Sequence, residues 1–70
     1  MKVAVYRRTQ EDYTTYTVIT EDNKGRVRVK TVSFENGKLC CDYYNLFTFD
    51  FDEECEASEH FKDELVYKSL

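Results

Sequence analysis

The segment RVRVKTVSFENGKLCCDY (residues 26–43) is the most informative part of the sequence about the fold, because its residue pattern predicts a β-hairpin. The Asn-Gly pair at 36–37 is the dipeptide most typical of a two-residue type I′ turn, whose central residues both have positive φ. β-branched and aromatic residues are dense on both sides of the turn, as in strands. The turn also predicts the register, with Phe34 opposite Leu39.

The same register places Val32 opposite Cys41. Val27 and Val29 occupy odd positions, whereas Val32 and Phe34 occupy even ones. In a regular strand the two pairs therefore lie on opposite faces. A β-bulge at residues 30–31 would return all four apolar side chains to one face. The alternative is a sheet that is apolar in patches on both sides.

Similar signals extend over the first half of the chain. Gly25, in the segment DNKGR, occupies a position where a short hairpin loop needs positive φ. We expect strands at about residues 2–8, 13–20, 26–34 and 38–51, connected as an antiparallel meander.

The last of these strands carries an aromatic series. Its apolar residues lie at odd positions and therefore on one face of an extended chain: Leu39, Cys41, Tyr43, Phe47, Phe49 and Phe51. A strand over 38–51 far exceeds the usual length of about five or six residues, so we expect a bend near Asn45. The alternative is a fifth short strand after Asn45.

After Phe51 the apolar period changes from two to about four. Ala57, Phe61 and Leu65 form the stripe of an amphipathic helix, which we expect at about residues 53–69. The stripe should cover the aromatic face of the preceding strand. The predicted fold is therefore one α+β domain over residues 1–70, a four-stranded antiparallel meander with a C-terminal helix packed on one face.

Acidic residues gather where the last strand meets the helix, and they have a structural interpretation. Either Asp50 or Asp52 can cap the helix, and Asp50 with Glu53 matches a capping box. Glu53, Glu54 and Glu56 lie in the first turn, where the helix dipole favours carboxylates. The alternative is a Mg²⁺ site at Asp50 and Asp52, but no phosphate-binding loop accompanies that pair. We expect no catalytic, cofactor or metal site.

The cysteines and the single histidine also lack a ligand pattern. Cys40 and Cys41 point to opposite faces of a regular strand, and the chain has no C-x-x-C pair. Cys55 and His60 diverge on a helix. An odd count of three cysteines also argues against a secreted disulfide scaffold.

Charge divides the chain into two parts. Residues 1–38 hold eight Lys and Arg against five acids, whereas residues 39–70 hold two against nine. The acidic helix face is the candidate surface for a partner protein: Glu53, Glu56, Glu59, Asp63 and Glu64. The candidate surface for single-stranded nucleic acid is a basic set, used together with the sheet tyrosines: Arg26, Arg28, Lys30, Arg7 and Arg8.

Size and composition exclude several classes. The 70 residues include 41% hydrophobic residues, so disorder is not expected. No apolar run reaches the length of a signal peptide or a membrane span, and we expect a cytoplasmic protein with no membrane partner. So small a core also favours self-association, and we expect a homodimer formed through an edge strand, with the short first strand over residues 3–7 as the candidate.

By elimination, the expected function is that of a small non-enzymatic interaction module. It would act as a regulator or inhibitor of a larger intracellular protein, and we hypothesise a phage or mobile element as its source. The alternative function is binding of single-stranded nucleic acid through the basic set.

Overall fold

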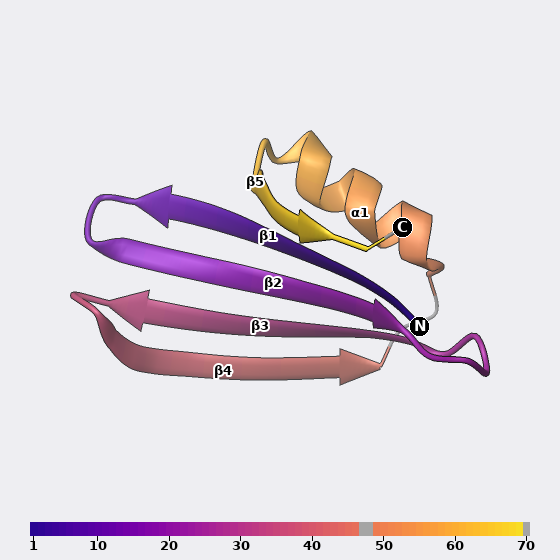
Figure 1. Ribbon diagram of the computed structural model, residues 1–70. Helices are drawn as coiled ribbons and strands as arrows, with labels where there is room; N and C mark the ends of the chain where they lie inside the picture. The colour runs from indigo at the N-terminus through magenta and orange to yellow at the C-terminus, as the bar shows by residue number, and fades with distance from the viewer. Residues whose placement is uncertain (47–48, 70) are drawn as a thin grey trace.

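The computed structural model describes the backbone of residues 1–46 and 49–69, and the side chains of these residues except 44–46. Its elements are β1 (Lys2–Gln10), β2 (Tyr13–Glu21), β3 (Val27–Glu35), β4 (Lys38–Leu46), α1 (Phe51–His60) and β5 (Glu64–Lys68). The strands form one antiparallel sheet in the order β4-β3-β2-β1-β5, and α1 packs on one face of it (Figure 1). The expected α+β meander is confirmed.

The three connections between the first four strands follow from local chemistry. Asn36 and Gly37 have φ values of 53° and 79°, as the type I′ turn requires. Between β2 and β3, the Asp22 carboxylate accepts hydrogen bonds from two backbone N–H groups, and Gly25 has a φ of 80°. Between β1 and β2, Glu11 adopts a φ of 51°.

The helix is shorter than the expected range of 53–69, and that prediction was wrong at its C-terminal end. Lys62 adopts a φ of 61°, and its N–H donates to the carbonyl of Glu59 at 3.0 Å. The N–H of Asp63 donates to the carbonyl of Ser58 at 3.1 Å. Together the two bonds form a Schellman motif, which ends the helix. Because a lysine occupies the position usually taken by glycine, the sequence carries no stop signal there.

The chain that leaves the helix forms β5, so the fifth strand lies at the C-terminal end and not after Asn45. It pairs antiparallel with β1, from Ala4 opposite Lys68 to Arg7 opposite Glu64. Residues 47–48, where the alternative strand would begin, lie outside the described residues. Since β1 now has two neighbours, it is not an edge strand, and the edges of the sheet are β4 and β5.

The register between β3 and β4 is confirmed at Phe34 opposite Leu39, and it then shifts. Ser33 lies opposite Cys41, so the extra residue of the bulge is Cys40. The expected pairing of Val32 with Cys41 was therefore wrong. β3 pairs with β2 without any shift, so there is no bulge at residues 30–31 on that side, and the sheet is apolar in patches on both faces.

The helix does not cover the aromatic face as expected. Its buried residues are Phe51, Cys55 and Ser58, which pack over β1 and β2, whereas Phe61 is 66% exposed and Leu65 50%. Phe49 is 54% exposed, and Phe47 lies outside the described residues. The buried hydrophobic residues come from β1, β2, β3 and α1: Ala4, Tyr6, Ile19, Val27, Phe51 and Cys55.

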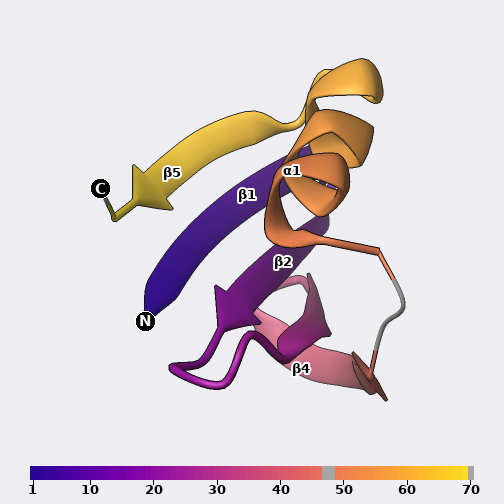
Figure 2. The same cartoon turned by 90° about the vertical axis from the view of Figure 1, so that its right-hand side faces the viewer.

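The sheet surface that faces away from α1 is called the open face. In the end-on view, α1 lies over one side of β1 and β2, and no element of the described chain lies over the other (Figure 2). The registers and the alternation of strands place these residues on the open face: Val3, Val5, Tyr16, Val18, Val32, Phe34 and Tyr67. The rings of Tyr16 and Phe34 meet edge to face, with their centroids 6.1 Å apart.

Candidate functional site

The first turn of α1 forms one wall of an acidic groove, which is named here by its lining residues: Phe49, Glu53, Glu54, Glu56 and Ala57. The groove has a volume of about 470 Å³. Asp50 initiates the helix, because its Oδ1 accepts a hydrogen bond from the backbone N–H of Glu53 at 2.8 Å. The cap at Asp50 is therefore confirmed, and it fixes the backbone of the first helical turn, which carries Glu53 and Glu54.

The groove combines negative charge with an apolar surface. Phe49 and Ala57 are both exposed, and the three glutamates stand around them. Within the described part of the chain, no lysine or arginine forms an ion pair with any of these glutamates. Partial burial, and then the neighbouring Glu53 carboxylate, raise the pKa of Glu54 above its ordinary value. A cation placed near Glu54 would act in the opposite direction, because it stabilises the ionised carboxylate.

Three of the five predicted partner-binding acids are engaged inside the molecule. The Tyr6 hydroxyl donates to Oε2 of Glu59 at 2.9 Å. Arg8 reaches Asp63 through Nε at 2.6 Å and through Nη2 at 3.3 Å, and only 6% of the Asp63 side chain is exposed.

Glu64 forms the third of these residue pairs with β1. Arg7 Nη2 lies 2.8 Å from Glu64 Oε1, and Arg7 Nε donates to Oε2 at 3.2 Å. Of the acids predicted from the helix face, Glu53 and Glu56 therefore remain as groove residues. The other three hold β5 and the helix end against β1.

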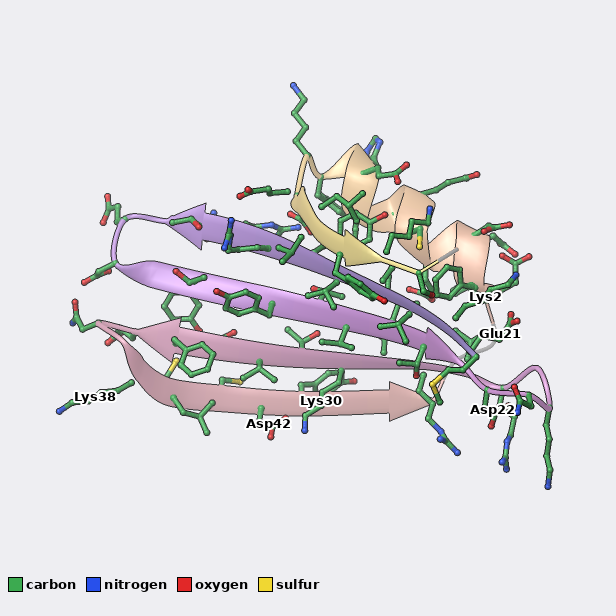
Figure 3. All side chains as sticks on the ribbon, in the orientation of Figure 1. Lys2, Glu21, Asp22, Lys30, Lys38 and Asp42 are labelled. Atoms are coloured by element: carbon green, nitrogen blue, oxygen red, sulfur yellow. The ribbon has the colours of Figure 1, made fainter. Side chains whose placement is uncertain are left out.

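Most residues of the predicted basic set also form ion pairs within the molecule. Arg7 and Arg8 are paired as described, and Arg26 Nε donates to Oδ2 of Asp22 at 2.9 Å. Lys30 Nζ lies 3.7 Å from Oδ2 of Asp42 across β3 and β4, on the side of the sheet away from the helix (Figure 3).

Arg28 differs from the other members of the basic set. Register places it on the open face opposite Thr20, and its Nε is buried without a hydrogen-bond partner in the described part of the chain. Within the described residues, therefore, Arg28 is the member of the basic set for which no ion pair is seen.

The cysteines do not lie as a regular strand would place them. Cys41 pairs with Ser33 on the helix side, and the bulge turns the Cys40 thiol to the Tyr13 hydroxyl on that same side, at 3.6 Å. Cys55 is buried, and burial raises the pKa of its thiol. In residues 1–46 and 49–69, no group of three or more His, Cys, Asp and Glu side chains is placed to hold a metal ion.

Sequence reasoning missed part of the groove. Glu54 was read only as a first-turn acid, and Phe49 was assigned to a covered strand face. The signal that could have identified the groove is the Asp50 cap, because it starts the helix at Phe51 and so places Phe49 directly before the first helical turn.

No known family model matches the chain, and no characterised protein or solved structure is significantly similar to it. Among the described residues, the single helix has ten residues and is too short and polar to cross a bilayer.

Proposed function

We propose that the chain is a small non-enzymatic interaction module that binds a basic segment of a larger protein and so regulates or inhibits it. The observation that supports this is the acidic groove. Its three glutamates have no cation within the described part of the molecule, and they surround the exposed surface of Phe49.

The groove matches the two parts of a lysine or arginine side chain. An aliphatic stem packs on Phe49 and Ala57, and a cationic head meets the carboxylates, as amphipathic cations do on mixed surfaces. A cation near a phenylalanine ring gains roughly 0.5–1 kcal/mol at an exposed site. The module would therefore prefer a partner segment in which basic residues project from the surface.

The internal contacts support the groove as the interaction site because, among the acids predicted from the helix face, they leave Glu53 and Glu56 without an ion pair in the described part of the chain. Asp63 and Glu64 are neutralised by Arg8 and Arg7. At Glu59, the carboxylate already accepts the Tyr6 hydroxyl. A basic partner would gain less there than at Glu53 or Glu56.

The test is a pull-down from the native host with three immobilised chains. The wild type is compared with the E53Q/E56Q variant and with the E11Q/E35Q variant, which changes net charge equally but lies at the two hairpin turns far from α1. We expect proteins retained by the wild type and the control to be lost from the groove variant. Identical retention by all three chains would refute the groove as the interaction site.

The second function, binding of single-stranded nucleic acid, is favoured by one observation. Within the described residues no ion pair of Arg28 is seen, so its charge on the open face could meet a phosphate, while the ring of Tyr16, four residues further along the sheet, could stack a base. The paired state of Arg7 and Lys30 weakens this candidate, since their charges are compensated. Fluorescence anisotropy with labelled poly-dT at low salt tests it: binding lost in R28E would support it, and no binding would eliminate it.

A further inference from the structure

The open face is built like one half of a β-sandwich. Its centre is apolar, with Val5 opposite Val18 and Tyr16 opposite Val32, and all of these side chains are half-buried by their neighbours alone. Two sheets that pack face to face bury such a layer between them, about 10 Å apart. No described element of the chain supplies the second sheet.

The size of the face suits an interface between two copies. The molecule measures 37 × 20 × 19 Å, so one broad side offers about 700 Å², close to the roughly 800 Å² that each partner buries in a standard interface. The chain exposes 5148 Å², whereas a folded monomer of 8.4 kDa exposes about 4,600 Å² on the usual scaling. The free chain therefore carries more surface than its mass requires.

The charge distribution makes this face more suitable than the other surfaces of the chain for contact with a second copy. The chain has a net charge of −4, so most surfaces of two copies repel each other. The open face instead carries three cations, of Arg7, Arg28 and Lys30, against the two carboxylates of Asp42 and Glu64. Its charges are thus nearly balanced.

The ion pairs also lie at the sides of this face. Arg7 pairs with Glu64 between β1 and β5, and Lys30 pairs with Asp42 between β3 and β4. A polar border around an apolar centre is the usual anatomy of a protein interface. The remaining cation of the face, Arg28, has no ion pair within the described residues, so its guanidinium could pair with a carboxylate of the second copy.

We propose that two copies of this chain pack open face against open face, forming a two-sheet sandwich with one α1 on each outer side. The dimer goes beyond the proposed function, because it concerns a different surface. It also replaces the expected edge-strand dimer with a face-to-face one. Each dimer would carry two acidic grooves, one on each copy.

The test measures the mass in solution by sedimentation velocity over a micromolar concentration series. We expect a species of twice 8.4 kDa for the wild type. V18E places a charge at the centre of the face and should raise the dimer dissociation constant at least about a hundredfold. The matched control, T31E, places the same charge on the helix side of the sheet and should leave the dimer intact.

Two further measurements keep the proposal falsifiable if V18E fails to fold. Y67K changes a side chain that is 56% exposed in the single chain, so it should fold and still weaken the dimer. Isotope-filtered NOE spectra of a mixed labelled sample should show contacts between valine methyls of one copy and the Tyr16 ring of the other. A monomer at every concentration would overturn the proposal, as would a dimer unaffected by both V18E and Y67K. The groove variant E53Q/E56Q should remain dimeric, so the two proposals can fail separately.

Discussion

The replacement of Tyr6 with Phe tests how the helix is held on the sheet. Tyr6 is 0% exposed, and its hydroxyl donates to Glu59 Oε2 at 2.9 Å. The variant keeps the ring and removes one hydrogen bond to a charged acceptor. Because Glu59 is exposed and water can replace the hydroxyl, the loss should be about 1 kcal/mol. In a domain of this size that lowers Tm by about 4–8 °C.

The pH dependence gives the same substitution a second signature. Burial, and then the hydrogen bond to Glu59, raise the pKa of Tyr6 above its ordinary value of 10.0. The unfolded tyrosine ionises near pH 10 while the folded one stays protonated. Its contribution to stability is therefore complete below about pH 10 and declines by about 1.4 kcal/mol per pH unit above it. Y6F lacks this decline, so its stability should equal that of the wild type near about pH 11.

The assay is urea denaturation followed by circular dichroism at a series of pH values from neutral to alkaline. Y67F is the control, because Tyr67 is 56% exposed and the variant keeps the ring that lies on the open face, so it should match the wild type at neutral pH. Equal stability of Y6F and the wild type at neutral pH would contradict the predicted hydrogen bond. Curves that stay parallel through alkaline pH would contradict the predicted pKa shift.

Substitutions at three other residues test the remaining local contacts. D50A removes the helix cap and should cost about 1 kcal/mol of unfolding free energy in thermal melts, whereas D50N should retain most of it. D63N weakens the forked contact to Arg8, and we expect a loss of about 1–2 kcal/mol in urea titrations, since that carboxylate is buried. For Asp22, the backbone N–H of Arg26 is the main cause that lowers its pKa to about 2, so its contribution is present above about pH 4 and is lost as the pH falls toward 2. Acid titrations of the wild type and D22N should therefore converge at the acid end; a constant difference would contradict the assignment.

The strands and turns were predictable because their signals are local. Asn36 and Gly37 accept positive φ at low cost, and this alone starts the β3–β4 hairpin. Asp50 likewise marks the start of the helix, since a side-chain oxygen that bonds a nearby N–H needs no distant partner. These features depend on a few neighbouring residues.

The end of the helix and the bulge were not predictable in the same way. Lys62 has a positive φ although it is not a glycine. The helix ends there because the chain that follows pairs with β1, which lies far away in the sequence. The bulge at Cys40 shifts the register of β4 by one residue after Phe34 and Leu39. Nothing in the sequence distinguishes Cys40 from its neighbours as the position of that extra residue.

The candidate site also has some features that depend on local sequence and others that depend on long-range contacts. The alternating strands, the tight turns and the capped helix start follow from the sequence, because each depends on the conformational preferences and periodicity of neighbouring residues. Which acids remain available was settled by the tertiary structure, since Tyr6, Arg7 and Arg8 meet Glu59, Glu64 and Asp63 across more than fifty residues. It also decided that one sheet face stays open, because a ten-residue helix followed by a returning strand covers a single side of β1 and β2.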